Sequence, residues 1–340
     1  MDLATSTDYL INVSALVRNS THFPSPASKA KLIITLPVFM SFIIGTITNG
    51  LYLWVLKFKM KRTVNTLLFF HLILSYFIMT WVLPFMATSF LQDNHWSFGT
   101  AMCKVFNGAL SLGMFTSVFF LSAISLDRYL LTLHPVWSQQ HRTPRWASNI
   151  TLGVWISATA LSTPYLVFRE TYDDHKGTVI CRNNYAVSAN WNSKEIQELR
   201  KWIHAACFIS RFLLGFLLPF FIIIFCYGRA AHKMKERGLV KSSKPFKVML
   251  TAIISFFVCW MPYHIYQGLI LTQNQSIFLQ FTLVLTVITT SFNTVFSPTL
   301  YLFIGEDFKR VFKKSILALF ESTFSEDSST ERTQNLNSGA

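Results

Sequence analysis

The sequence predicts an all-α membrane protein that folds as a bundle of seven transmembrane helices. Three observations support this fold class. The 340 residues are 51% hydrophobic and 16% aromatic, with 33 phenylalanines, and only 14% are charged, whereas about a quarter of a soluble domain is charged. Seven windows are apolar over a length that crosses a hydrocarbon core, which needs roughly 20 residues per helix. Short segments rich in charged or turn residues separate these windows.

The seven predicted helices follow one another along most of the chain. Each begins and ends where charged or turn residues interrupt the apolar run. Their predicted ranges are 32–56, 66–90, 102–133, 146–168, 202–227, 248–271 and 278–304. An odd number of crossings places the two chain termini on opposite sides of the membrane. The chain therefore divides first into an N-terminal tail over 1–31 and a seven-helix domain over 32–304.

Basic residues in the loops predict the orientation of the bundle. They gather after the first, third, fifth and seventh helices, and the segment after the fifth helix holds Arg229, Lys233, Lys235, Arg237, Lys241, Lys244 and Lys247. Because basic loops stay in the cytoplasm, the N-terminus is predicted to be extracellular in a multi-pass plasma-membrane protein. The net charge of +14 lies beside apolar spans, where anionic lipid attracts it. We therefore expect the lipid bilayer, and no nucleic acid, as its partner.

The predicted outer side carries two kinds of covalent site. Asn12 in Asn12-Val13-Ser14 and Asn19 in Asn19-Ser20-Thr21 are N-glycosylation acceptors on the N-terminal tail. Of the five cysteines, only Cys103 and Cys181 fall outside the membrane on this topology, so the oxidising compartment allows one disulfide between them. The other three lie within helices, where cysteine is most often a packing residue.

Several polar and proline motifs stand inside or at the ends of the predicted helices. Asp127-Arg128-Tyr129 ends the third helix; it could be an ordinary interfacial ion pair whose cation snorkels to water, or a functional site, because ionisable groups in a membrane are costly. Prolines bend helices, and they recur near aromatic residues, at Pro219 before Tyr227, at Trp260-Met261-Pro262 and at Pro298 before Tyr301.

With these motifs in order, the chain resembles the rhodopsin-like G-protein-coupled receptors over about residues 32–320. Further matching residues are Asn49, Trp96-Ser97-Phe98-Gly99, Trp155 and Phe308-Lys309-Arg310-Val311-Phe312. The last of these is similar to the amphipathic eighth helix of the family, which implies a helix over 305–320 and a disordered tail over 321–340. Within the family the chain resembles the chemoattractant group near the formyl-peptide and chemerin receptors, and within that group an orphan receptor. The resemblance to the chemoattractant group rests on the segments Arg211–Phe216 and His134–Trp137.

The resemblance implies a receptor rather than an enzyme. A ligand would drive helix six outward and open a cytoplasmic pocket for a heterotrimeric G protein, with inhibitory coupling expected from the group. Arg128 of Asp127-Arg128-Tyr129 would be the central contact, with Tyr227 and Tyr301 beside it. The activation switch would be Trp260 and Pro262, together with Pro219 and Pro298.

The ligand is expected to be an extracellular peptide or a small anion. Leu110 stands on the ligand-facing side where amine receptors of this family carry aspartate, and helix seven has no lysine for retinal. Arg211, eight residues before Pro219, places a guanidinium in the outer half of the bundle, where it can bind a carboxylate with two hydrogen bonds. The alternative is a structural bond to a polar neighbour. Trp260 would form the floor of the ligand site.

Some positions depart from the family pattern. Tyr76 stands where most relatives have the aspartate of a sodium site, and Ser297 replaces the Asn or Asp before Pro298, while Ser117 and Asn293 match. Without a carboxylate, a sodium ion lacks charge compensation, so we expect no metal and no cofactor. The lost acid also leaves open a second function, a non-signalling decoy or modulatory receptor of the same fold.

The C-terminal tail has two interpretations. It is acidic and rich in hydroxyl groups, with Ser322, Thr323, Ser325, Ser328, Ser329 and Thr330. Phosphorylation would add clustered negative charge of the kind that arrestin reads, whereas the composition equally suits a plain disordered tail.

Overall fold

The computed structural model describes residues 26–173, 177–185, 194–238, 244–272, 277–301, 309–315 and 317. Seven spans in these ranges are long and apolar enough to cross a membrane. The predicted seven-helix bundle is therefore confirmed. The predicted tail over 1–31 lies almost wholly outside the described residues, and the tail over 321–340 lies wholly outside them. Of the predicted helix over 305–320, residues 309–315 and 317 are described, and these are helical.

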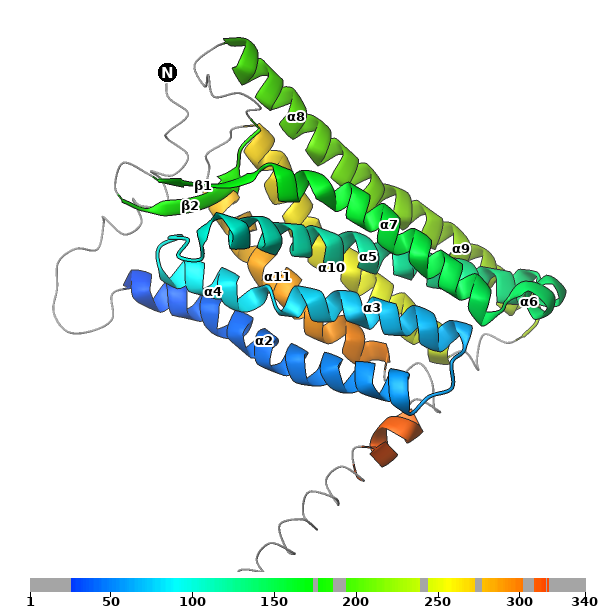
Figure 1. Ribbon diagram of the computed structural model, residues 1–340. Coiled ribbons are helices and arrows are strands. Elements are labelled where there is room, and N and C mark those ends of the chain that lie inside the picture. Colours follow the sequence, from blue (N-terminus) through cyan, green and yellow to red (C-terminus); the bar gives the residue numbers. More distant parts are fainter. Residues whose placement is uncertain are drawn as a thin grey trace, which may run out of the picture.

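The long helices run side by side and form the bundle (Figure 1). They are α2 (Pro26–Phe58), α3 (Val64–Thr80), α4 (Leu83–Leu91), α5 (Gly99–Leu133), α7 (Pro144–Val167), α8 (Lys194–Phe212), the π-helical turn η2 (Leu213–Leu217), α9 (Leu218–Glu236), α10 (Lys244–Leu271) and α11 (Ile277–Tyr301). A hairpin of β1 (Arg169–Asp173) and β2 (Val179–Asn183) lies at one end, which we call the hairpin end. A short helix, α6 (Pro135–His141), lies at the other, which we call the α6 end.

Two of the seven spans are built from more than one helix. The second span, Val64–Leu91, is interrupted between α3 and α4, where Pro84 stands in the first turn of α4. The fifth, Glu195–Glu236, joins α8, η2 and α9 and is 42 residues long, much longer than the predicted 202–227. An apolar window ends at the first charges, but Lys, Glu and Arg are good helix formers, so the helix continues beyond the apolar part at both ends.

The hairpin was not predicted, and it carries the disulfide. β1 and β2 pair antiparallel with Thr171 opposite Cys181. Cys181 is joined to Cys103 at the start of α5, with 5.7 Å between the two Cα atoms. The backbone N–H of Trp96 donates to the carbonyl of Val179 at 2.7 Å, and the indole donates to the Gly99 carbonyl at 2.8 Å. These bonds and the disulfide fix the hairpin to the bundle.

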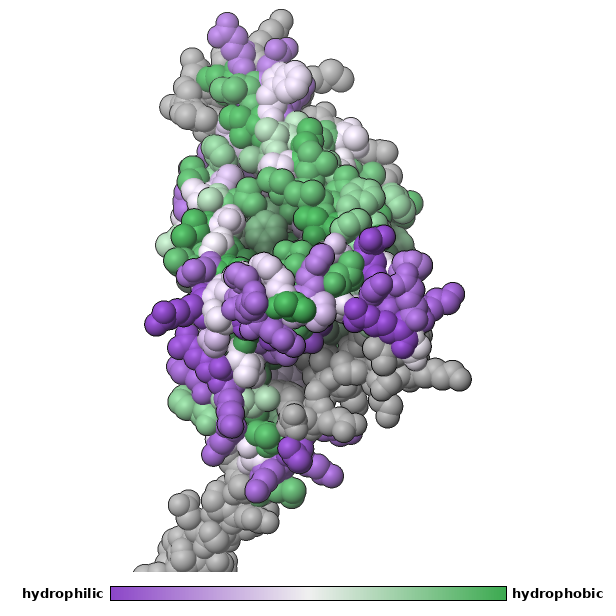
Figure 2. Space-filling view, turned by 90° about the vertical axis from the view of Figure 1, so that its right-hand side faces the viewer, coloured by the Kyte–Doolittle hydropathy of each residue, from purple (hydrophilic) through white to green (hydrophobic). Residues whose placement is uncertain are grey.

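Aromatic side chains fill the interior, and apolar side chains also cover the outside. Among the largest fully buried residues are Trp260, Tyr76, Phe115, Phe120 and Phe256. Large apolar residues such as Phe221, Ile224 and Phe225 on α9 are more than half exposed, as expected for a surface that faces lipid. Seen at the α6 end, hydrophilic residues gather across the middle of the face, below a hydrophobic region (Figure 2).

Two glycines let α5 approach its neighbours closely. A Cβ atom on Gly113 would overlap the side chain of Met79 on α3 and lie 3.3 Å from the Ser75 carbonyl oxygen. One on Gly108 would overlap Leu166 on α7. Small residues at helix crossings permit this contact in membrane proteins. The third span is therefore held against two helices along the middle of the bundle.

Candidate functional site

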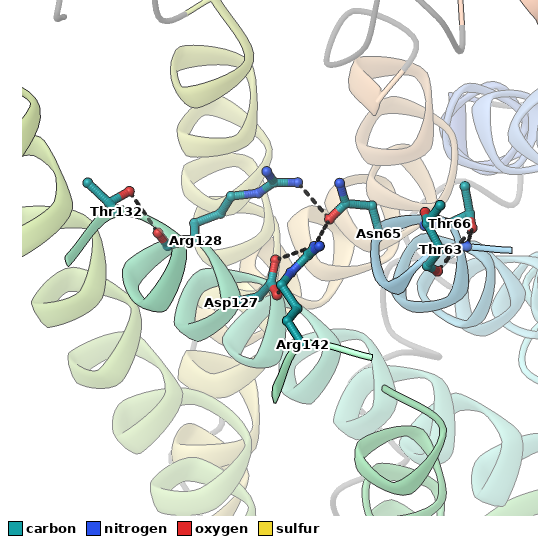
Figure 3. Close-up of polar contacts among 7 residues, drawn as sticks. All are labelled: Thr63, Asn65, Thr66, Asp127, Arg128, Thr132 and Arg142. Atoms are coloured by element: carbon teal, nitrogen blue, oxygen red, sulfur yellow. Dashed lines mark hydrogen bonds and ion pairs between the residues drawn. The ribbon is translucent and has the colours of Figure 1, made fainter. Parts of the chain in front are cut away.

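At the α6 end, Asp127 forms its ion pair with Arg142 and not with its neighbour Arg128. Asp127 is 2% exposed. Arg142, the residue that follows α6, donates from Nε to Asp127 Oδ1 at 2.6 Å and from Nη2 to Oδ2 at 3.1 Å. The interfacial pair between Asp127 and Arg128, considered from the sequence, is not formed. Figure 3 shows the Arg142 guanidinium against the carboxylate.

Asn65 on α3 joins the two arginines of this end. Its Oδ1 accepts a hydrogen bond of 2.6 Å from Nη2 of Arg142 and one of 3.0 Å from Nη2 of Arg128, which reach it from different sides (Figure 3). The position of Asn65 is fixed because α3 begins with a capping box, in which the Thr63 side chain accepts from the Thr66 backbone N–H and the Thr66 hydroxyl accepts from the Thr63 N–H. Sequence reasoning did not find Asn65 or Arg142 as site residues.

The other residues predicted to couple to a G protein lie in different surroundings. Tyr227 is buried on α9 and is an electrostatic neighbour of Arg128. The ring of Tyr129 instead packs against Phe225 and His134, with centroid distances of 5.9 and 6.1 Å. Tyr301 ends α11, and its side chain lies outside the described residues.

At the hairpin end, Arg211 is buried and holds its guanidinium among aromatic rings. It is 6% exposed and lies on α8 directly before η2. Its Nη2 donates to the Ser111 hydroxyl at 3.1 Å. The guanidinium carbon lies 3.5 Å from the Tyr165 ring centroid and 5.2 Å from that of Tyr263. Its Nε has no hydrogen-bond partner among the described residues.

Arg169, the first residue of β1, is a second cation in the same place. It donates from Nη1 to the Cys181 carbonyl at 3.2 Å, and its Nε has no partner in the described part of the chain. Burial lowers the pKa of Arg169 to about 10, and Arg211 acts in the same direction, whereas Tyr185 opposes the shift. The guanidinium therefore stays charged at neutral pH. Sequence reasoning placed Arg169 only at the start of a charged loop.

The two arginines line one narrow cavity. Its other lining residues are Tyr165, Asn183, Tyr185, His204, Cys207, Phe208 and Gln267. The space open to a water-sized molecule is about 10 Å³, which is about enough for one water. The ionisable groups that act electrostatically on Arg169 and Arg211 are tyrosines, a cysteine and the arginines themselves, with no carboxylate among the described residues. Among the described residues, this conformation therefore holds one buried cation, Arg211, and one partly buried cation, Arg169, without an anion.

A π-helical turn and a ring contact connect Arg211 with the predicted switch residues. The turn η2 ends with the Leu218 N–H bonded to the Leu213 carbonyl, and Pro219 follows in the first turn of α9. Proline crowds the carbonyl four residues before it, so a π turn at this point accommodates Pro219. Trp260, 1% exposed, contacts the Tyr263 ring at 5.4 Å. Arg211, Tyr263 and Trp260 thus form a continuous contact.

The remaining predicted residues lie in the interior. Pro262 stands within α10 and Pro298 within α11. Leu110 on α5 is partly buried and packs against the hydrophobic core. Asn12 and Asn19 lie outside the described residues.

The four residues predicted for an altered sodium site are buried polar side chains, and none of them is a carboxylate. Tyr76, Ser117, Asn293 and Ser297 are each 0% exposed. The Ser297 hydroxyl donates to Asn293 Oδ1 at 2.7 Å, and the Ser117 hydroxyl donates to the Met114 carbonyl at 2.9 Å. No group of three or more His, Cys, Asp or Glu that could hold a metal ion occurs in the described ranges.

The seven-span bundle, with its disulfide-tied hairpin over a buried pocket, has the architecture of a membrane receptor. The chain belongs to the family described as "7 transmembrane receptor (rhodopsin family)", which matches residues 48–301. It is accordingly a multi-pass plasma-membrane receptor and not an enzyme, and its family signals through G proteins in response to extracellular ligands.

Comparison with individual proteins supports this assignment. The chain is similar to Probable G-protein coupled receptor 33 of Homo sapiens, with 80% identity over 334 residues that cover 98% of this chain and 100% of that protein. The protein of the same name from Mus musculus is 70% identical over 338 residues, which cover 99% of each chain. Chemerin-like receptor 1 of Mus musculus is 40% identical over 304 residues, covering 86% of this chain and 81% of that protein.

Proposed function

We propose that this chain is a cell-surface receptor for a peptide or small ligand with an anionic group, and that it signals through an inhibitory heterotrimeric G protein. Because basic segments stay in the cytoplasm, the α6 end faces the cytoplasm in this proposal, and the N-terminus and the hairpin end face outward. The observation that carries the ligand proposal is the pair of arginines, the buried Arg211 and the partly buried Arg169, without a carboxylate partner among the described residues.

The ligand chemistry follows from the cost of burying a charge. A desolvated guanidinium is unfavourable unless an opposite charge and hydrogen bonds compensate it. One nitrogen of Arg211 donates to the neutral Ser111 hydroxyl, and Nε of each arginine has no hydrogen-bond partner among the described residues. A carboxylate between them would accept charge-assisted bonds from both. Because the cavity holds about one water, the ligand binds a more open conformation and shifts the population toward it.

Transmission to the other end would begin at Trp260. A carboxylate that draws Arg211 toward the cavity changes its contact with Tyr263, which touches Trp260. Pro262 follows Trp260 by two residues in α10 and removes a backbone donor there. The hydroxyl of Thr289 on α11 donates to the Cys259 carbonyl beside it at 2.8 Å. The hinge therefore joins the two helices, with Pro219 and Pro298 permitting adjustment in α9 and α11.

The cytoplasmic half of the proposal assigns Arg128 as the central G-protein contact. Tyr227 is its neighbour on α9, and Asp127 and Tyr129 complete the motif. Tyr301, the last residue of α11, is the further residue that we assign to coupling. Phosphorylation of the tail over 321–340 would recruit arrestin, and glycans would attach at Asn12 and Asn19. The helix over 305–320 would lie on the inner leaflet.

The test compares two peptides that differ only in the C-terminal group. A panel of chemoattractant peptides with free carboxylates and the same peptides as amides are applied to cells, and inhibitory G-protein dissociation is measured. We expect a response to at least one carboxylate peptide, weakened about 100-fold in potency by amidation or by Arg211→Gln, since removing one partner of a buried charged pair costs about 2–5 kcal/mol. Lys201→Gln, an exposed lysine of the same helix, is the control.

The outcomes separate the ligand from the signalling. Equal potency of acid and amide forms would reject the anionic-ligand proposal. An Arg128→Ala variant at the same surface level must lose the response to the carboxylate peptide, because that arginine is the proposed G-protein contact.

A second candidate is a decoy or modulatory receptor of the same fold. Tyr76 in place of a central acid and Ser297 before Pro298 favour it, because a hydroxyl group replaces the family's carboxylate at the first position and its amide or carboxylate at the second. A surface-expressed chain that binds a labelled carboxylate peptide and never dissociates a G protein would establish this second function.

A further inference from the structure

We propose that Arg142 is a positioning residue that holds Asp127 away from Arg128 and leaves the coupling arginine bonded to a neutral amide. Arg142 lies between α6 and α7 and outside the Asp127-Arg128-Tyr129 motif. The functional consequence rests on the proposed role of Arg128 in G-protein contact, whereas the ion-pair exchange does not.

The bond between Arg142 and Asp127 has the geometry of a strong pair. Two parallel hydrogen bonds, of 2.6 and 3.1 Å, join the guanidinium edge to both carboxylate oxygens. The Asp127 side chain is 2% exposed and the Arg142 side chain 19%, so water screens the pair little. A bidentate guanidinium–carboxylate pair of this kind is among the strongest polar contacts in proteins. Arg142 therefore satisfies Asp127 on its own.

Arg128 is correspondingly held by a weaker contact. Its Nη2 bonds to Asn65 Oδ1 at 3.0 Å, and that oxygen also accepts the 2.6 Å bond from Arg142 (Figure 3). Its Nε is buried without a hydrogen-bond partner among the described residues. An amide oxygen carries no formal charge and here serves two donors. Releasing Arg128 toward a G protein therefore breaks a bond to a neutral group, with no ion pair to break.

Without Arg142, Asp127 can exchange its ion-pair partner for the adjacent Arg128. Asp127 and Arg128 are consecutive residues at the end of α5, so the carboxylate and the guanidinium are within reach of one another once Arg142 is absent. In the Arg142→Gln variant, Asp127 should therefore form its ion pair with Arg128. The new pair would hold Arg128 in the resting state and reduce coupling.

A thermal double-mutant cycle tests the exchange without any ligand or G protein. The full chain is purified in lipid nanodiscs, and Tm is measured for Asp127→Asn, Arg128→Gln and their combination. We expect the deviation of the two shifts from additivity to be larger by about 2 °C or more in the Arg142→Gln background than in the otherwise wild-type chain. Arg145 is an exposed arginine three residues further on, and in the Arg145→Gln background the deviation should equal that of the wild type.

The opposite results reject the proposal. An Asp127–Arg128 non-additivity that is already present in the wild-type background and is unchanged by Arg142→Gln would show that Arg142 does not separate them. If Arg142→Gln fails to fold, Arg142→Lys, which keeps the charge but loses the bidentate geometry, should give an intermediate non-additivity; the wild-type value would contradict the inference.

A signalling readout then tests the consequence. Basal inhibitory G-protein dissociation per surface receptor should fall about fivefold in Arg142→Gln, and Arg145→Gln should leave it unchanged. A rise in basal activity would overturn the functional part of the inference. If the wild type couples to no G protein under any ligand, the proposed function fails, while the thermal cycle still decides the role of Arg142.

Discussion

The two ends of the bundle each contain a pair of buried or partly buried arginines, but they treat these charges differently. At the α6 end, Arg142 has the carboxylate of Asp127, and Arg128 and Arg142 share Asn65. At the hairpin end, Arg169 and Arg211 donate to neutral oxygens, and the described residues provide no carboxylate for them. Because the first pair has an internal anion and the second has none in the described part of the chain, we expect the ligand to bind at the second pair. Burial alone would not have distinguished them.

The largest expected effect breaks the comparison by removing the internal anion. Asp127→Ala leaves the partly buried Arg142 without a carboxylate and with only its bond to Asn65, and should lower the free energy of unfolding by about 2–4 kcal/mol. Arg211→Gln removes a cation that has no anionic partner, so in the ligand-free protein it should lower stability little or raise it. Thermal unfolding in nanodiscs measures both. Lys31→Ala, which removes an exposed ion pair with Asp93, is the control and should stay close to the wild type.

The next effect concerns the hairpin end alone. Cys181→Ser frees β2 from α5 and should destabilise the chain by about 2–4 kcal/mol. Because Arg169 bonds to the Cys181 carbonyl, the potency of a carboxylate peptide should also fall. The Asp127–Arg142 coupling, measured by a thermal double-mutant cycle, should be unaffected. A simultaneous loss of that coupling would mean that the two ends are not independent.

A smaller effect tests the helix that connects the two ends. Gly113→Ala introduces a Cβ that overlaps Met79, although the flexible Met79 side chain partly adjusts. We expect a loss of about 1–3 kcal/mol of stability, seen as a lower Tm and lower surface expression. Gly228→Ala, where a Cβ atom meets open space, is the matched control. Equal behaviour of the two variants would argue against close packing of α5 on α3.

The smallest effect is an expected absence of response in the middle of the bundle. Tyr76 is fully buried and carries a phenol where a sodium site would need a carboxylate, so changing sodium for an equal concentration of a larger monovalent cation should not alter agonist affinity. A radioligand titration at constant ionic strength measures this. A reproducible shift in affinity would show that a cation does bind beside Ser117, Asn293 and Ser297.

How much of this could be predicted from the sequence depends on the range of the interaction. The seven spans follow from local apolarity and are present in the structure, and Arg211 was singled out because an isolated charge within an apolar window is visible in the sequence. Asn65, Arg142 and Arg169 carry no such signal, because each is an ordinary polar residue near a loop. Their importance arises from contacts across 63 to 77 residues of chain at the α6 end and from the fold of the hairpin.

The hairpin and the length of the fifth span were not predicted from the sequence, for a related reason. Charged residues before Trp202 looked like loop, yet α8 begins at Lys194, since helix formation needs backbone hydrogen bonds and tolerates a polar surface. The β1–β2 pairing has only five residues in each strand and is held by Cys181 and Trp96. Neither tether appears as a periodic pattern, so composition alone indicated a charged loop.

The π turn at Leu213–Leu217 determines which way Arg211 faces. A helix advances by about 100° per residue, so one additional residue in a turn rotates everything before it by about that angle relative to Pro219. In an uninterrupted α-helix counted back from Pro219, residue 211 would point in a different direction. Closing the π turn into a regular α-helix with no deletion should therefore turn the Arg211 guanidinium away from Ser111, even though every side chain named in the pocket would still be present. Deleting one residue from Leu213–Leu217 should instead remove the π turn and leave the guanidinium directed toward Ser111.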